Sequence, residues 1–436
     1  MSEPAELRPP ARILARPEHP ISRARFSPNA LKVLYRLQRG GFLAYLVGGA
    51  VRDLLLGRKP KDFDIGTNAR PQQVRQLFRN SRVIGRRFRI VMVRFSDEIV
   101  EVATFRRSPE PPEIEEGETT DVLAPTPEAE EFGTPEEDAS RRDFTVNALF
   151  YNIADYSVID YVGGLEDLRA SVIRTIGPSS QRFSEDPVRM MRAVEYGARL
   201  GFRLDQEATE AIGVMHGEIR RAAPARIAYE LMESLKGGQA LPIFRGLEES
   251  GLLAHTLPEA HGAAGMPDAL LWRLLARADE RVRRGERLAE ESLLAVLFLP
   301  SVIDALAGDR EGPRAPAEVE RTVRERLDAA ALRLALSHYR SHIVRSSFLL
   351  LSRVLAPPKS AKFVLRTFKH EAFPVTWELA HLLAAADDRF RPLLAPWEEA
   401  VARVQAGLAP EEKPSGRRQR RRGGARRRGR KPAGQA

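Results

Sequence analysis

The spacing of hydrophobic and polar positions changes along this chain of 436 residues. Between residues 29 and 105, short apolar runs alternate with stretches in which apolar residues recur every three to four positions. From residue 184 to about residue 407 the helical spacing continues almost without interruption. This change of pattern predicts an α+β fold: an N-terminal head with a mixed β-sheet, followed by an all-α neck and body.

The bounds of the expected elements come from glycines and prolines that interrupt the pattern. In the head we expect the last two strands to flank a turn at Gly163-Gly164, and in the helical part we expect breaks at Gly201, Gly251 and Pro357-Pro358. Helices are expected at 29–38, 50–56 and 71–79, and strands at 42–47, 62–65, 90–95, 98–105, 157–162 and 172–175.

Charge and proline content divide the chain further. Residues 108–140 hold twelve acidic residues, six prolines and no basic residue, which is typical of a mobile inserted loop. Residues 413–436 hold eleven Lys and Arg and no acid, and their composition favours a disordered tail. The expected domains are an N-terminal extension (1–27), the head (28–183, with the acidic mobile insertion at 108–140), a helical neck (184–260), a helical body (261–408) and an Arg-rich tail (409–436).

The composition excludes several classes of protein. The absence of cysteine excludes disulfides, thiolate metal sites and a cysteine nucleophile, and it fits a reducing cytoplasm. The longest apolar run, Leu293 to Leu299, is shorter than the roughly 18 residues of a membrane span. The arginine-rich tail suits phosphate groups, so we expect it to contact nucleic acid, although a merely solubilising terminus has the same composition.

Two acidic residues in KDFDI are the first candidates for chemistry. In a strand, Asp62 and Asp64 share one face at about 7 Å, so they could hold a divalent metal together. Taken alone, an acid-x-acid triplet is a weak signal in a chain with 59 acidic residues. Two-metal chemistry usually needs a third acidic ligand, for which Glu101 in EIVEVATF and Asp143 in RRDF are the candidates. Glu101 could instead be a solvated residue at a sheet edge.

The segment LVGGAVRD reads as a strand, a glycine pair and a helix start. Gly48 and Gly49 would let a phosphate approach the backbone, and Arg52 lies in the first turn of the helix. Arg142, beside Asp143, would neutralise a polyphosphate. The alternative is a plain tight turn with surface arginines. A Walker loop is excluded because the chain has no Gly-Lys pair.

A third cluster lies in SEDPVRMMRAVEYGARLGF. Asp186 is expected at a helix N-cap with Pro187 in the first helical position. Arg189 and Arg192 then fall near one face of that helix. A capped helix with solvated arginines explains the same residues.

In chain order, the segments LVGGAVRDLLLG, KPKDFDI, EVATFR, RRDFTVNAL, YVGGLEDL and EDPVRMMRA resemble the head and neck of the class II nucleotidyltransferases that extend RNA 3′ ends. That family contains bacterial poly(A) polymerase and the tRNA CCA-adding enzyme. The resemblance runs from about residue 12 to about residue 258 and covers six segments in the family's order.

The resemblance implies a role for each candidate. It implies Mg²⁺ in a two-metal site at Asp62 and Asp64, with Asp143 also catalytic, and ATP as substrate. It implies that the nucleotide is bound by Gly48, Gly49, Arg52, Arg142, Asp186, Arg189 and Arg192, with Gly49, Arg52 and Arg142 at the triphosphate and Asp186, Arg189 and Arg192 at the base. It also implies that the helical body (261–408) binds RNA.

The resemblance leaves the product open. A carboxylate beside a guanidinium can pair with the edges of both adenine and cytosine, so the neck alone does not separate poly(A) synthesis from CCA addition. The long insertion and the arginine-rich tail resemble the poly(A) polymerase branch. We therefore expect a cytoplasmic, template-independent polynucleotide adenylyltransferase that acts on RNA 3′ ends in RNA polyadenylation. The alternatives are a tRNA CCA-adding enzyme and a non-catalytic RNA-binding protein on the same fold. The sequence names no protein partner.

Overall fold

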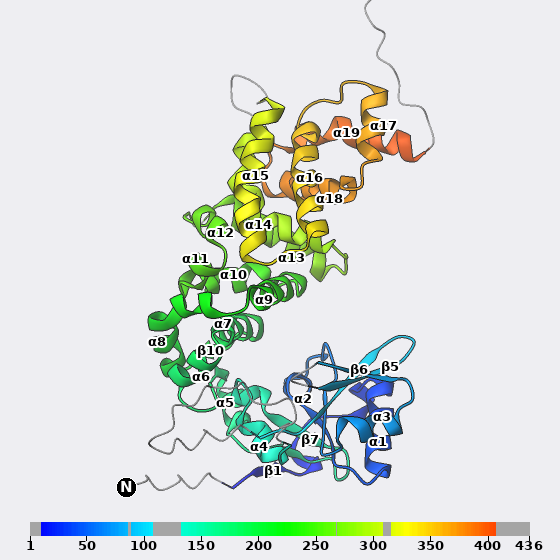
Figure 1. Cartoon of the computed structure of the whole chain (residues 1–436), viewed down its shortest axis with the longest axis vertical. Helices are drawn as coiled ribbons and strands as arrows, with labels where there is room; N and C mark the ends of the chain where they lie inside the picture. The colour runs from blue at the N-terminus through cyan, green and yellow to red at the C-terminus, as the bar shows by residue number, and fades with distance from the viewer. Residues whose placement is uncertain (1–9, 86–88, 108–131, 267, 308–314, 407–436) are drawn as a thin grey trace, which may run out of the picture.

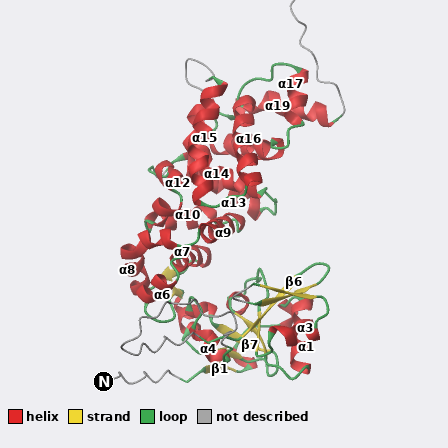
Figure 2. Cartoon of the chain, in the orientation of Figure 1, coloured by secondary structure: helices red, strands yellow, loops and turns green. Residues whose placement is uncertain are grey.

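The computed structural model describes residues 10–85, 89–107, 132–266, 268–307 and 315–406. Figure 1 shows a head that contains the sheet at one end and helices that continue from it along the long axis of the molecule. Figure 2 shows that the strands are confined to the head and to the first part of the helical region. The expected α+β fold class is confirmed.

The head is built on an eight-stranded mixed sheet with the strand order β1-β8-β7-β2-β3-β6-β5-β4. The central strand β2 pairs antiparallel with β3 and with β7, and β3 pairs parallel with β6. The strands of this sheet are β1 Arg12–Leu14, β2 Ala44–Val47, β3 Ile65–Thr67, β4 Ser81–Ile84, β5 Ile90–Arg94, β6 Ile99–Thr104, β7 Leu149–Asn152 and β8 Val158–Asp160.

Helices α1 and α3 cover one face of this sheet. Val100 and Val102 of β6 are buried under them, together with Val33 and Leu34 of α1, because alternate residues of a strand point to the same face. Helix α1 begins after the N-cap Ser27, whose hydroxyl accepts from two backbone N–H groups of the first turn. The helices of the head are α1 Pro28–Arg39, α2 Gly49–Leu55, α3 Pro71–Leu77, α4 Pro135–Ser140 and α5 Gly164–Ala170.

The rest of the described chain is helical apart from a two-stranded parallel sheet of β9 Val172–Ile173 and β10 Arg203–Leu204. None of its helices is both long enough and apolar enough to span a membrane. These helices are α6 Ser179–Glu185, α7 Val188–Leu200, α8 Gln206–Met215, α9 Pro224–Lys236, α10 Ala240–Glu249, α11 Leu252–Thr256, α12 Pro258–Ala263, α13 Leu270–Arg283, α14 Glu290–Ala307, α15 Pro316–Arg333, α16 His338–Val354, α17 Ala361–Phe368, α18 Phe373–Ala386 and α19 Arg391–Gln405.

Some local expectations were wrong. The strand expected at 62–65 begins only at Ile65, because β3 pairs with β2 from the Ile65–Leu46 position onward. The strands expected at 157–162 and 172–175 do not flank a simple turn: helix α5 separates them, and they belong to different sheets. The helical pattern after residue 184 hides β10, which is too short to give a period of its own.

The expected extension and insertion also contribute ordered elements. Residues 12–14 form β1, an edge strand that pairs with β8. Residues 135–140 form helix α4, which starts with a capping box between Thr134 and Glu137. Residues 108–131 of the acidic insertion and the arginine-rich tail lie outside the described residues.

Candidate active site

A cavity of about 510 Å³ lies between the head and the neck. Its walls come from α2, from the segment before β3, from the segment after α4, and from α7 and α9. Among the sequence-predicted site residues, those that line it are Gly48, Gly49, Arg52, Asp62, Asp64, Arg142, Asp143, Asp186, Arg189 and Arg192. The tertiary fold therefore brings together residues that are far apart in the chain, whereas Glu101 is not part of the wall.

At the glycine pair, the backbone of Gly48 lies close to the side chain of Arg142. Gly48 has φ +71°, and a Cβ atom there would lie 3.0 Å from Nη1 of Arg142. The Gly48 N–H donates to the carbonyl oxygen of Leu149 (3.0 Å), so it belongs to the sheet. Gly49 and Ala50 start α2, where backbone N–H groups have no carbonyl partner within the helix. The wall therefore offers main-chain donors beside the Arg142 guanidinium.

Asp62 and Asp64 lie in the segment before β3 that is neither helix nor strand, and the Asp64 carbonyl oxygen accepts from the N–H of Val47 (3.0 Å). The Asp64 carboxylate is open to the cavity, but desolvation by the surrounding protein and the negative charges of Glu101 and Asp62 raise its pKa to about 6, against an opposing effect of Arg142. Desolvation and the charge of Asp62 also raise the pKa of Glu101. The three carboxylates therefore repel one another, although only Asp62 and Asp64 line the cavity.

The raised pKa of Asp64 predicts how pH affects the metal-free protein. A carboxyl group whose pKa is higher in the folded than in the unfolded state contributes stability at low pH, and this contribution is lost as pH rises through about 6. The Asp64→Asn variant should lack this loss, so it should unfold at a higher urea concentration than the parent at pH 8 in the presence of a chelator, and the difference should shrink near pH 4. Equal midpoints at both pH values would contradict the raised pKa.

The donor set fits a hard divalent cation, because Mg²⁺ binds carboxylate oxygens and a cation relieves the repulsion around Asp64. Asp62 and Asp64 would hold it. Within the described residues, no three His, Cys, Asp or Glu side chains gather closely enough to hold one metal ion. Asp62 and Asp64 are therefore two candidate ligands, and among the described residues no third side chain completes a group that could hold one ion.

Arg52 is buried in the wall of the cavity. Its Nε donates to Oδ1 of Asp53 (2.9 Å) and its Nη1 donates to Oδ1 of Asn147. Its guanidinium carbon lies 5.3 Å from the ring centroid of Tyr196. A buried guanidinium needs a counter-charge, which Asp53 supplies, and Asn147 ties α2 to the segment that follows Arg142 and Asp143.

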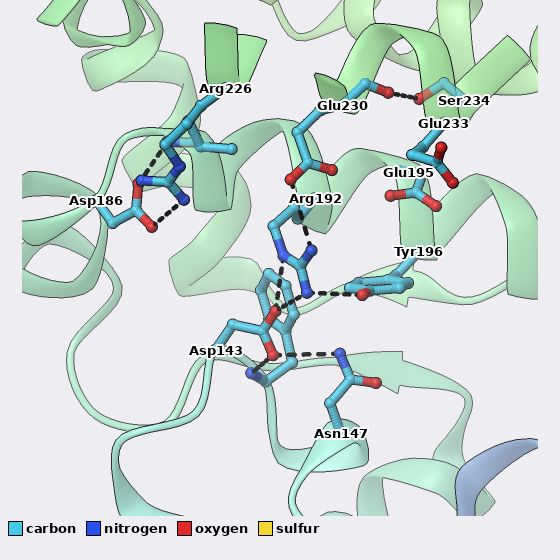
Figure 3. Close-up of polar contacts among 12 residues, drawn as sticks. Asp143, Asn147, Asp186, Arg192, Glu195, Tyr196, Arg226, Glu230, Glu233 and Ser234 are labelled. Atoms are coloured by element: carbon cyan, nitrogen blue, oxygen red, sulfur yellow. Dashed lines mark hydrogen bonds and ion pairs between the residues drawn. The ribbon is translucent and has the colours of Figure 1, made fainter. Parts of the chain in front are cut away.

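A salt-bridge network joins the head to the neck through Arg192 of α7. Figure 3 shows its guanidinium between Asp143 and Glu230. Nε and Nη2 of Arg192 donate to Oδ2 of Asp143 (2.9 and 2.7 Å), while Nη1 lies 3.6 Å from Oε1 of Glu230. Asn147 and the N–H of Phe144 also donate to Asp143. Oδ2 of Asp143 is therefore paired with the neck, while its Oδ1 accepts from two groups of the head.

The ionisation of this pair follows from these contacts. Burial opposes the charge on Asp143, but attraction by Arg192 and the hydrogen bonds from Arg192, Asn147 and Phe144 outweigh it and lower the pKa of Asp143. Burial also opposes the charge on Arg192, and the Asp143 carboxylate raises the pKa of Arg192 despite it. Both groups are charged at neutral pH.

The expected N-cap was wrong by one residue: Pro187, not Asp186, is the N-cap of α7, because the helix begins at Val188. Oδ1 of Asp186 still accepts from the N–H of Val188 (3.2 Å). Both Asp186 oxygens accept from Arg226 of α9 (2.8 Å each), as Figure 3 shows. Arg189 donates through Nη1 to Glu185 and to the Arg182 carbonyl (both 2.9 Å). Asp186 and Arg189 both line the cavity, but Asp186 is paired with α9, whereas Arg189 is paired with the segment that precedes α7.

The sequence did not single out several residues of the wall. Asn147 lies within RRDFTVNAL, and Tyr196 lies within the α7 segment, but neither carries a charge that marks it. Arg226, Tyr229, Glu230 and Glu233 come from α9, which reads as an ordinary amphipathic helix. Their charged face could have been noticed, but nothing local shows that it turns toward the head.

Two family models match the chain. The model described as "Poly A polymerase head domain" matches residues 44–174, and the one described as "Probable RNA and SrmB- binding site of polymerase A" matches residues 201–263. The chain is 38% identical over 426 residues to poly(A) polymerase I of Salmonella typhi, covering 94% of this chain and 90% of that protein.

CCA-adding enzymes match less of the chain or only its fold. The CCA-adding enzyme of Bacillus velezensis is 36% identical over 244 residues, covering 56% of this chain and 58% of that protein. The solved structure of the Bacillus stearothermophilus CCA-adding enzyme in complex with CTP superposes with a TM-score of 0.60 at 24% identity, covering 86% of this chain and 83% of that chain. This likeness concerns the fold.

The mixed-sheet head, the helical neck and the relatives together define a nucleotidyltransferase. Within that class, the chain belongs to the poly(A) polymerase and CCA-adding enzyme family.

Proposed function

We propose that this chain is a template-independent polynucleotide adenylyltransferase that transfers AMP from ATP to RNA 3′ ends. The observation that carries this choice is the extent of the similarity. It runs over 94% of the chain for the poly(A) polymerase I of Salmonella typhi, but over 56% for the CCA-adding enzyme of Bacillus velezensis. The regions beyond the head and neck therefore favour poly(A) synthesis over CCA addition.

In this proposal the head binds the triphosphate. Gly49, Ala50 and Arg142 line the cavity, where the N–H groups of the first two and the guanidinium of the third would donate to phosphate oxygens. Arg52 supplies positive charge from within the wall, held by Asp53. Asp62 and Asp64 would hold Mg²⁺, which when bound would activate the RNA 3′-hydroxyl and stabilise charge on the triphosphate. Asp143 would orient Arg192 at the site.

The neck would select the base. Adenine presents an amino donor beside a ring-nitrogen acceptor, so it needs one acceptor and one donor from the protein. Among the described residues, Oδ2 of Asp186 accepts only from Arg226, so the oxygen has a second lone pair for the amino group of the base. Arg189 uses Nη1 for Glu185 and Arg182, and its other donors would serve the ring nitrogen. This arrangement would accept cytosine as well, so the preference for ATP is tested directly.

The Arg189→Ala variant is expected to weaken the preference for ATP. Removing the donor leaves the ring nitrogen of a bound adenine unpaired, at a cost of about 1 to 3 kcal/mol. The measurement compares incorporation of ATP, CTP, GTP and UTP at fixed Mg²⁺. Arg221→Ala removes an arginine of the neck that pairs with Glu218 and does not line the cavity, and it is the control. An unchanged preference in the Arg189 variant would assign that residue to structure.

The proposed activity itself is tested with purified protein, Mg²⁺ and each nucleotide in turn, on an unstructured RNA and on a tRNA that lacks its CCA end. Long adenylate tails on the unstructured RNA are expected. Addition limited to CCA on the tRNA would establish the alternative activity, and binding of either RNA without incorporation would indicate a non-catalytic protein. We further propose a cytoplasmic location, in keeping with the absence of cysteine.

A further inference from the structure

A second cavity of about 640 Å³ lies on the head, in a groove between α1, the end of α3 and the end of β5. It shares no lining residue with the cavity between head and neck. Three cationic residues and three aromatic residues line it, with no carboxylate: Lys32, Arg36, Arg39, Tyr35, Phe78 and Phe95.

The groove and the carboxylates lie on opposite faces of the sheet. On β6, Val100 and Val102 are buried under α1 and α3, whereas Glu101, between them, points to the other face and interacts electrostatically with Asp62 and Asp64. Figure 1 shows α1 and α3 together at the edge of the head that is remote from α7. A molecule in the groove therefore does not occupy the active-site cavity.

The cations of the groove lack acidic partners. Lys32, Arg36 and Arg39 recur at helical spacing along the exposed side of α1, and none of them forms an ion pair in the described part of the chain. At the head–neck cavity, by contrast, Arg142 and Arg192 are each paired with an aspartate. Uncompensated positive charge on one helix face is the electrostatic signature of a surface for phosphate groups.

The aromatic residues add a second kind of contact. The Nζ of Lys32 lies 5.7 Å from the ring centroid of Phe95, and the Cζ of Arg36 lies 5.2 Å from that of Phe78. Tyr35 and Phe95 are half-buried, so part of each ring faces the groove. Guanidinium planes and aromatic rings stack on nucleobases whatever their sequence, while Lys and Arg follow the phosphates.

We infer that this groove binds single-stranded RNA upstream of the 3′ end that occupies the active site. The inference rests on the proposed function for its choice of RNA as the polyanion. An RNA chain would then contact the head twice: at its end in the cavity beside α2 and α7, and further back on α1. A short RNA would reach only the first of these sites.

The test compares two double variants that remove equal charge. Arg36→Ala with Arg39→Ala strips the groove, whereas Arg12→Ala with Arg169→Ala removes two exposed arginines without ion pairs elsewhere on the head. Alanine keeps the helix propensity of α1. Affinity for an unstructured RNA of about 30 nucleotides is measured over a salt series, since each lost phosphate contact lowers the salt slope by about 0.7. The groove variant should lose about 1.4 in slope and roughly tenfold in affinity at low salt, and the control should lose neither.

A second measurement locates the contact. Photoreactive uridines placed upstream in the RNA should crosslink to Tyr35 or Phe95 in the parent and much less in the groove variant. Steady-state adenylation should show a raised KM for the long RNA and an unchanged KM for a primer of about five nucleotides.

The inference would be wrong if the two double variants had equal salt slopes and equal KM values for the long RNA. The groove would then have to be tested for binding of an acidic protein segment instead. Failure of the proposed function would give a different result: the parent protein would not adenylate even the short primer. The salt dependence of RNA affinity would still show whether RNA binds in the groove.

Discussion

Replacing Asp64 with asparagine is expected to reduce AMP transfer by roughly two to three orders of magnitude, the scale of losing a principal electrostatic group at the reacting atoms. The amide keeps the shape of the side chain but removes the charge that would hold Mg²⁺ together with Asp62. Single-turnover rates at saturating RNA and ATP measure the effect. RNA affinity should stay within a few-fold of that of the parent, because no proposed RNA contact involves this carboxylate.

Asp97→Asn is the matched control, since Asp97 lies on the head in the turn between β5 and β6 and accepts from Asn29 rather than facing the cavity. It should retain near-parental activity. An Asp64→Asn protein that is folded and works within tenfold of the parent would refute the metal assignment. Because the same substitution should stabilise the metal-free fold at neutral pH, loss of activity could not be ascribed to unfolding.

Replacing Arg192 with methionine should destabilise the protein by about 3 kcal/mol at neutral pH, because it leaves the Asp143 carboxylate largely buried without its cation. The substitution removes two hydrogen bonds to Asp143 and the contact to Glu230 that ties α7 to α9. AMP transfer should fall as well, since the neck would no longer be held against the head. Urea unfolding followed by circular dichroism measures the loss of stability.

The pH dependence separates charge from packing. In the parent, the lowered pKa of Asp143 contributes stability above its unfolded pKa that is lost as pH falls. In the variant, the unpaired carboxyl favours its neutral form, so the difference from the parent should shrink toward pH 4. The double variant Arg192→Met with Asp143→Asn should recover more than half of the loss at neutral pH. A cost that is equal at both pH values and unrelieved in the double variant would contradict the ion-pair account.

Local sequence determined several parts of this molecule. The glycines in LVGGAVRD required a turn between β2 and α2, and the observed φ of +71° at Gly48 is one that a side chain would strain. Alternation along EIVEVATF placed Val100 and Val102 in the core and Glu101 on the other face. These features depend on neighbours a few residues apart, so a local pattern is sufficient to predict them.

The partners of the charged residues could not be predicted in this way. Asp143 meets Arg192, 49 positions away, and Asp186 meets Arg226, 40 positions away. Which carboxylate faces which guanidinium depends on the angle at which α7 and α9 pack against the head. The start of β3 likewise depended on its pairing with β2, which moved Asp62 and Asp64 off the expected strand.

The sequence by itself determined the α+β class and the family resemblance, and it singled out part of the cavity wall but not the side chains that α9 contributes. Only the tertiary structure decided that Asp143 holds Arg192, that Arg52 is buried against Asp53, and that α1 presents an unpaired basic face beside aromatic rings. The physical reason is that periodicity and turn chemistry act through short stretches of backbone, whereas burial and ion pairing are set by contacts between elements distant in the chain.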